Sequence, residues 1–201
     1  MGERTKTSIS NLALREIGTY RIEDFDNDDS AEAEILRDVW ADVLRSCLGR
    51  HEWRFAMKQA ELQQGETPVA RYEYSYRLPA DYVRLSVVSD RDTMEPITDW
   101  DIIYTTGEPV PCVITNQATC YVEYVGEVDD PNAWAPHFVE YFTAVLASRI
   151  ASPLKSTIER QRLVEYAEKS ALPMARSADS TLQPPKRPPL GNWIKSMRMG
   201  G

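Results

Sequence analysis

Cysteine and histidine are the residue types in this sequence that could serve as nucleophiles, general bases or metal ligands. Cys47 and His51 are four residues apart, the spacing of neighbours on one helix face, and a cysteine beside a histidine is the arrangement of a cysteine-dependent enzyme. The sequence shows no third group that would orient the histidine, and pairs at this spacing are common by chance. The structural interpretation is therefore favoured, and the enzyme alternative predicts a thiol with an unusually low pKa.

The other cysteines and the second histidine lack partners at metal-ligand spacing. Cys112, Cys120 and His137 are scattered, and no Cys-x-x-Cys motif occurs. The chain also lacks a nucleophile elbow, a Walker loop, a dinucleotide-binding glycine pattern and a zincin motif. An odd number of scattered cysteines fits a reducing compartment better than a disulfide framework. We expect no catalytic residue, no metal site and no cofactor.

A run of carboxylates is the other concentration of reactive groups. Seven acids and no base lie between residues 23 and 34, namely Glu23, Asp24, Asp26, Asp28, Asp29, Glu32 and Glu34. A calcium-binding loop would need Asp-x-Asp-x-Asp-Gly and a glutamate at position twelve, and this pattern is absent. The favoured interpretation is a solvated segment whose acids stabilise a helix N-terminus. The alternative is a surface past which DNA moves without sticking.

The charge divides the chain into an acidic body and a basic tail. Residues 183–201 carry four bases and no acid, a charge of +4. Because the net charge of the chain is −8, residues 1–182 carry −12. An acidic body argues against a general nucleic-acid binder, and Tyr72, Tyr74 and Tyr76 are interpreted as sheet packing rather than a base-stacking platform. A hydrophobic content of 42% predicts a folded body, and no apolar run is long enough to cross a membrane.

The tail, residues 183–201, has a composition of its own and is predicted to be an extended arm. It is rich in proline and basic residues, and proline prevents it from joining the core as a helix. We expect a partner to hold the arm, with Trp193 and Ile194 at the centre of the contact, because buried aromatic side chains dominate interface hot spots. An alternative is that Pro185 and Pro188 dock in an SH3-like groove. The predicted binding residues are Pro184, Pro185, Lys186, Arg187, Pro188, Pro189, Leu190, Trp193, Ile194 and Lys195.

Hydrophobic periodicity predicts helices at both ends of the body. The first covers residues 8–17 before Gly18, and the second begins at a capping box of Asp29 and Glu32 and ends at Gly49. A third, over residues 138–150, is apolar almost all round, which predicts a central buried helix that follows Pro136 and is broken by Pro153. The last opens with Ser156 and Glu159 and runs to about Leu172; its expected inward residues are Leu163, Tyr166, Ala167 and Leu172, and Glu165 and Lys169 form an exposed pair.

Between these helices the period changes from 3.6 to 2. Alternation predicts strands at residues 53–57, 72–78, 83–87 and 119–125, with weaker signals at 102–104 and 112–114. Pro79 to Asp81 is a predicted turn. The expected fold is α+β: a helical bundle with an inserted antiparallel sheet of about four to six strands. Residues 1–182 would form one domain, with the β-rich insertion at about 52–126.

Several short motifs follow one another in the order of a known family. Residues 14–18 read Leu-Arg-Glu-Ile-Gly, and residues 52–56 read Glu-Trp-Arg-Phe-Ala. Residues 76–85 contain a Leu-Pro-x-Asp turn between two strands, and residues 134–150 form a late helix. With these motifs in this order over residues 8–172, the chain resembles the head-to-tail adaptor (connector) proteins of tailed bacteriophages, the tail tubular protein A and gatekeeper-like group.

The resemblance implies a structural virion protein without enzymatic activity, located in the neck between capsid and tail and present in the host cytoplasm during assembly. Such adaptors form a homo-dodecameric ring under the portal, extend the DNA channel and provide a platform for the tail. The implied partners are the portal protein, neighbouring adaptor subunits, a downstream tail or nozzle protein, and genomic DNA that passes without sequence-specific binding. No membrane is implied. The carboxy-terminal arm would embrace the portal. A monomeric interaction module with a docking proline-rich tail is the alternative, and a cysteine-dependent enzyme is less favoured.

Overall fold

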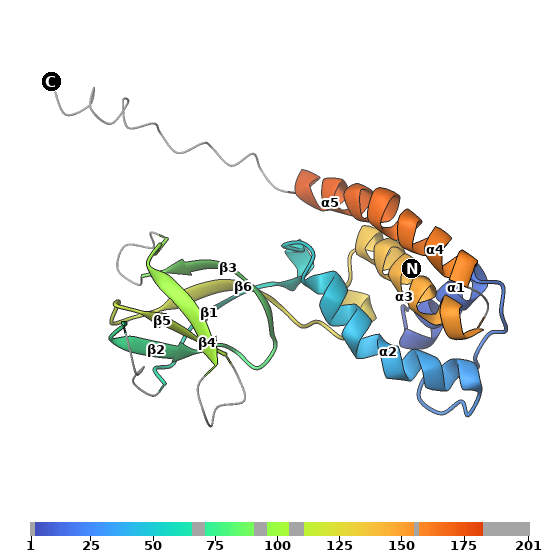
Figure 1. Ribbon diagram of the computed structural model, residues 1–201, viewed down its shortest axis with the longest axis horizontal. Helices are drawn as coiled ribbons and strands as arrows, with labels where there is room; N and C mark the ends of the chain where they lie inside the picture. Colours follow the sequence, from blue (N-terminus) through green and yellow to red (C-terminus); the bar gives the residue numbers. More distant parts are fainter. Residues whose placement is uncertain (1–2, 66–70, 91–95, 105–110, 155–156, 183–201) are drawn as a thin grey trace, which may run out of the picture.

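The computed structural model describes residues 3–65, 71–90, 96–104, 111–154 and 157–182. Its architecture is α+β, because helices at both ends of the chain enclose the strands (Figure 1). The helices gather in one lobe and the strands in another, and the chain passes from the helical lobe to the strands and back (Figure 1). The predicted fold class is therefore confirmed.

The amino-terminal helix, α1 (Lys6–Glu16), begins at a reciprocal side-chain cap. The Thr5 hydroxyl accepts the N–H of Ser8, and the Ser8 hydroxyl accepts the N–H of Thr5. This capping box satisfies two of the donors that a helix N-terminus leaves unpaired. The helix stops before Gly18, which has a φ of 64°, a conformation that glycine adopts without strain.

The second helix, α2 (Ala31–Leu48), has its N-cap one residue later than predicted. Its N-cap is Ser30, whose hydroxyl accepts the N–H of Ala33 at 3.4 Å. The prediction of a capping box between Asp29 and Glu32 is therefore wrong. A serine directly after the acidic run takes the cap, and Glu32 instead lies in the first turn, where its charge favours the helix N-terminus.

The strands form two three-stranded antiparallel sheets. The first has the order β1 (Met57–Glu61), β6 (Tyr121–Gly126) and β3 (Tyr82–Ser89), and the second has the order β2 (Tyr74–Arg77), β5 (Pro111–Thr115) and β4 (Trp100–Tyr104). The prediction of a single sheet is wrong. Tyr76 and Val113 of one sheet share a buried cluster with Val88 and Val122 of the other, so the two sheets cover each other's apolar faces. Val125, at the end of β6, is instead buried in the helical core.

The link between the helices and the first strand also differs from the sequence prediction. Residues 53–57 were expected to be extended, but Arg54–Ala56 form a 3₁₀ turn and β1 starts only at Met57. Trp53 is the reason, because it is fully buried in the helical core and its indole N–H donates to the Cys47 carbonyl at 2.9 Å. The predicted turn at Pro79 is confirmed by a hydrogen bond from the Tyr82 N–H to the Pro79 carbonyl, at 3.0 Å.

The central helix is α3 (Pro136–Leu154), and it is buried as its all-round apolar pattern predicts. Phe142 of α3 packs against Trp40 of α2 with ring centroids 5.0 Å apart, and Trp134, just before α3, packs on Phe142 at 4.8 Å. Aromatic contacts of this kind add to the energy of burial. The helix runs one residue past Pro153 instead of ending before it.

The last helix extends well beyond its predicted end at Leu172. The helix α4 (Thr157–Tyr166) passes through a π-helical segment, η3 (Ala167–Ala171), into α5 (Leu172–Thr181). A proline inside a regular α-helix would clash with the carbonyl four residues earlier, and a wider π turn ahead of Pro173 relieves that clash. Ser156 of the predicted capping box lies outside the described residues.

The inward face of this helix is largely as predicted. Leu163, Ala167 and Leu172 are buried, and the predicted exposed pair of Glu165 and Lys169 forms with 3.9 Å between the carboxylate and the ammonium. The exception is Tyr166, which was expected to face inward and is 53% exposed. None of the helices in the described ranges is long and apolar enough to span a membrane.

Candidate interaction site

Asp179 fastens the last helix to the rest of the molecule. Its side chain is 1% exposed, with Oδ1 3.2 Å from Nε2 of His137 and Oδ2 3.4 Å from Nε2 of His51. The backbone N–H of Arg54 also donates to the carboxylate, at 3.3 Å. Both histidines of the chain therefore contact one carboxylate. His51 follows the end of α2, and His137 lies in the first turn of α3.

The electrostatics of this cluster favour hydrogen bonding over a full ion pair at His51. Burial lowers the pKa of His51, and the negative charge of Asp179 opposes that effect only in part. A neutral ring with its hydrogen on Nε2 still donates to the carboxylate. Trp53 packs against both rings, with centroids 4.9 Å from His51 and 6.2 Å from His137. The carboxylate thus has three donors, which is what a buried charge needs.

Sequence reasoning missed Asp179, although a signal for it exists. Buried residues recur every fourth position along the last helix, at Leu163, Ala167, Ala171 and Ala175, and the next position is Asp179. An acid that continues an otherwise apolar stripe predicts a buried carboxylate with partners on a neighbouring element. The sequence prediction ended this helix at about Leu172, so Asp179 lay outside it.

Cys47 and His51 contact different groups, because the Cys47 thiol interacts with the side chain of Tyr141. The helix α2 ends at Leu48, and His51 contacts Asp179. The thiol of Cys47 is buried, and burial raises its pKa to about 12, the opposite of the lowered pKa that the enzyme alternative predicts. Asp179 has almost no exposed surface through which a substrate would reach it. Across the described ranges, no group of three or more His, Cys, Asp and Glu residues is placed to hold a metal ion.

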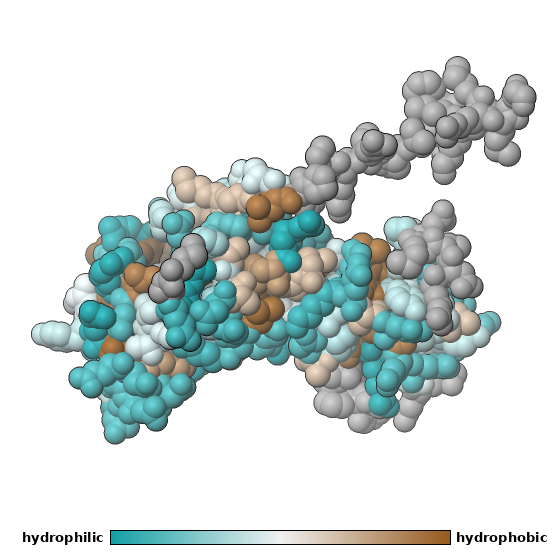
Figure 2. All heavy atoms as spheres, turned by 180° about the vertical axis from the view of Figure 1, so that it is seen from behind, coloured by the Kyte–Doolittle hydropathy of each residue, from teal (hydrophilic) through white to brown (hydrophobic). Residues whose placement is uncertain are grey.

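Exposed apolar side chains gather on the last helix. In the described part of the chain, five of the seven large exposed hydrophobic residues belong to residues 157–182, namely Ile158, Val164, Tyr166, Met174 and Leu182. Figure 2 shows apolar atoms at the surface of the helical lobe, near the end of α5. Single exposed hydrophobic residues are ordinary, but a concentration on one element indicates a contact surface.

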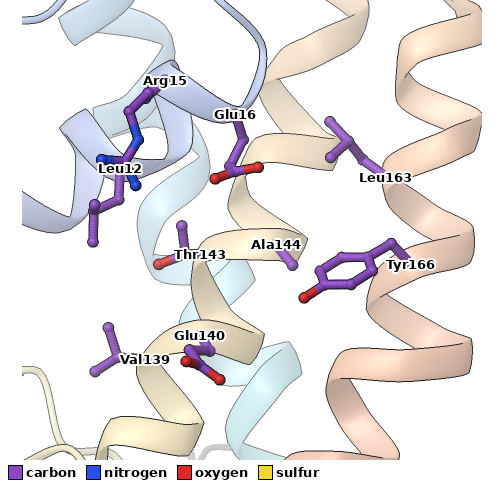
Figure 3. Close-up of a pocket in the computed structure, with 9 residues that line it drawn as sticks. All are labelled: Leu12, Arg15, Glu16, Val139, Glu140, Thr143, Ala144, Leu163 and Tyr166. Carbon is purple, nitrogen blue, oxygen red and sulfur yellow. The ribbon is translucent and has the colours of Figure 1, made fainter.

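A groove lies along the inner edge of the same helix (Figure 3). It has a volume of about 390 Å³ and is bounded by α1, α3 and α4. Its apolar walls are Leu12, Val139, Ala144 and Leu163, and the charged Arg15, Glu16 and Glu140 also line it. The hydroxyl of Thr143, another lining residue, is buried without a hydrogen-bond partner in the described part of the chain. The apolar walls and charged surroundings suit a side chain from a protein partner.

The binding residues predicted in the arm, Pro184–Leu190 and Trp193–Lys195, lie outside the described residues. Leu182, the last described residue, is 62% exposed and follows directly on α5. The cluster at Asp179 lies three residues before it. The helix that precedes the arm is therefore held to the body close to the position where the arm begins.

We compared the chain with protein-family models and with curated proteins, and none of them matches it. The case for a function accordingly depends on the motifs of the sequence and on the surfaces described above.

Proposed function

We propose that this chain is a ring subunit of a head-to-tail adaptor in a tailed bacteriophage, which docks under the portal, extends the DNA channel and provides a platform for the tail. The observation that carries the proposal is the last helix. It is fixed to the body through Asp179, carries most of the exposed apolar side chains of the described residues, and leads directly into the proline-rich basic arm.

The charge distribution supports a role as a conduit for DNA. Residues 1–182 carry a net charge of −12, so a ring of these bodies would repel the phosphate backbone rather than bind it. The arm, residues 183–201, instead carries four bases and no acid, together with Trp193 and Ile194. A short basic arm with a central aromatic residue suits docking on a protein partner.

The surfaces also meet the requirement for a ring. Subunits related by rotation contact each other head to tail, so each copy needs two different surfaces for its neighbours, in addition to any surface for the portal. The helical lobe offers the groove and apolar side chains along α4 and α5 as one surface, and the acidic loop at residues 23–29, before α2, as another. The arm would then remain available for the portal protein, and the tail or nozzle protein would contact the opposite side of the ring.

Removal of the arm tests the proposal directly. A chain ending at Leu182 should keep its far-ultraviolet circular dichroism and lose co-sedimentation with portal rings. The full-length Trp193→Ala/Ile194→Ala variant should lose portal binding in the same way, because these two side chains form the expected centre of the contact. The matched control is Met197→Ala/Met199→Ala, which changes two apolar residues of the same arm and should bind normally.

Portal attachment that survives both the deletion and the Trp193→Ala/Ile194→Ala change would refute the assignment of the arm. A wild-type chain that stays monomeric in light scattering, ignores the portal and binds an SH3 domain through Pro185 and Pro188 would favour the alternative of a monomeric interaction module.

A further inference from the structure

A second hollow opens between α2, α3 and α4. It has a volume of about 230 Å³, and three arginines line it: Arg50, Arg149 and Arg160. Arg50 is paired with Glu168, at 3.2 Å between the guanidinium and the carboxylate. The side chains of Arg149 and Arg160 are exposed and make no ion pair or hydrogen bond with other described residues. This arginine cleft therefore offers two positive charges that are unpaired within the described ranges.

The acidic loop, residues 23–29, is a preformed surface of the opposite charge. The Asp24 carboxylate accepts the backbone N–H groups of Asp26 and Asn27 at 2.8 and 2.9 Å, and these hydrogen bonds lower the pKa of Asp24. Phe25 anchors the middle of the loop, because it is buried and packs on Trp40 with ring centroids 4.9 Å apart. A loop held in this way loses little conformational entropy when it binds.

Two carboxylates of the loop are free to make contacts elsewhere. Asp26 and Asp29 are exposed, and their side chains have neither an ion pair nor a hydrogen bond in the part of the chain that the structure describes. Two nearby bases contact groups other than these two carboxylates: Arg37 donates to the carbonyls of Phe25 and Asp28 at 2.9 Å, and Lys6 pairs with Asp129. The loop therefore keeps an excess of negative charge.

The two surfaces lie at opposite ends of α2. The loop directly precedes the helix, whereas the cleft contains Ser46 in its last turn and Arg50 just beyond it. With 18 residues, α2 separates them by about 27 Å. In Figure 1 the amino-terminal end of α2 points away from the strands and its carboxy-terminal end lies toward them. The loop of one copy therefore cannot fill its own cleft.

We propose that the arginine cleft receives the acidic loop of a second copy of this chain, with Arg149 and Arg160 facing Asp26 and Asp29. The inference depends on the proposed ring, because a contact between two different ends of one molecule is the heterologous kind that closes into a ring when it repeats by rotation. Arginine forks match carboxylates in geometry as well as charge. Val164, which also lines the cleft and is 41% exposed, adds an apolar contact.

Charge reversal in two complementary variants provides the test. In the full-length chain, Arg149→Glu/Arg160→Glu makes the cleft acidic, and Asp26→Lys/Asp29→Lys makes the loop basic. Each variant alone presents a cleft and a loop of the same sign. In a mixture of the two, every cleft meets a loop of opposite sign, so an alternating assembly becomes possible. The control is Asp38→Lys/Asp42→Lys, at two exposed positions of α2 outside the loop. It changes the net charge by the same amount as the loop variant Asp26→Lys/Asp29→Lys.

The measurement is adaptor–adaptor association, followed by native mass spectrometry and sedimentation at low ionic strength, with and without portal rings as a template. Each reversed variant should associate with itself about 25-fold more weakly than the wild type, since two interfacial ion pairs contribute roughly fivefold each. The equimolar mixture should recover wild-type association, and the control should associate normally. Recovery on mixing also demonstrates that both variants are folded.

Undiminished self-association of either variant, or a mixture that fails to recover, would overturn this interface. So would loss of binding to double-stranded DNA in Arg149→Glu/Arg160→Glu with association unchanged, since the cleft would then be a phosphate site. These outcomes are separable from failure of the proposed function, in which the wild-type chain itself would not dock on the portal.

Discussion

Replacement of Asp179 by alanine is the most informative single change in the described part of the molecule. It removes the acceptor shared by His51, His137 and the backbone N–H of Arg54, and it leaves three donors facing a small cavity. Because these partners come from the segment after α2 and from α3, the substitution should loosen the whole of α5. We expect a large loss of stability with the overall fold retained.

The structure sets the magnitude of this loss. Each of the three donors that loses its acceptor costs about 1–3 kcal/mol when it stays buried and unpaired, so the total loss is about 3 kcal/mol or more. His51 and His137 keep 24% and 17% of their side-chain surface exposed, so water can reach them in the variant and the lower end, about 3 kcal/mol, applies. For a chain of this length each kcal/mol corresponds to about 2–4 °C, so the melting temperature should fall by about 6–12 °C.

The assay is urea unfolding followed by circular dichroism and by tryptophan fluorescence, since Trp53 packs between the two imidazoles. Asp179→Asn should lose roughly half as much as Asp179→Ala, because it retains one acceptor oxygen. Asp38→Ala is the matched control: Asp38 is an exposed helical aspartate, and its loss should change stability by less than about 0.5 kcal/mol. An Asp179→Ala chain as stable as this control would refute the reasoning.

Two further predictions concern the titratable groups of the core. Because burial is the main cause of the lowered pKa of His51, its neutral form is favoured in the folded state. Stability should therefore hold above about pH 6.5 and decline as the pH falls below that value, and urea midpoints between pH 5 and 8 should show a smaller decline in His51→Gln. The thiols should be unreactive toward a disulfide reagent until the protein unfolds, because all three cysteines are buried and burial raises the pKa of Cys47 and Cys120 to about 12. Rapid labelling of Cys47 in the native protein at neutral pH would contradict this and would revive the enzyme alternative.

The sequence predicted correctly those helices and strands whose hydrophobic pattern reflects a single, simple burial environment. The helix at residues 136–154 is apolar all round because other helices surround it, and this hydrophobic pattern alone predicts that the helix is buried. The strand at residues 121–126 is similar in its first part, since Val122 and Tyr124 are buried and Tyr121 and Glu123 are less buried, whereas Val125 and Gly126 at its end are both buried. Packing was predicted for Tyr72, Tyr74 and Tyr76 for the same reason; Tyr72 and Tyr76 are buried, and Tyr74 is partly buried against the cluster that contains Tyr76.

The features that were missed depend on partners distant in sequence. Whether six short strands form one sheet or two depends on which apolar faces pack together. Tyr76 and Val122, for example, belong to the buried cluster that the two sheets share. The alternation of apolar and polar residues carries no information about such pairings. Similarly, nothing near His51 and His137 in the sequence indicates a shared carboxylate. They are separated from Asp179 by 128 and 42 residues, and only the packing of α5 brings them together.

The π-helical segment links the sequence of the last helix to the role of the arm. Along a regular α-helix, residues four apart advance by about 40° around the axis, so a four-residue stripe from Leu163 to Asp179 would drift by about 160° and leave the buried side. A π turn takes up about one extra residue and turns the following stretch back by roughly 100°. The segment Ala167–Ala171 thereby keeps Asp179 in the buried stripe. A proline at position 173 would usually end a helix, but here it follows directly on the π-helical segment and the helix continues. The continued helix places Asp179 against the body, three residues before the last described residue, Leu182.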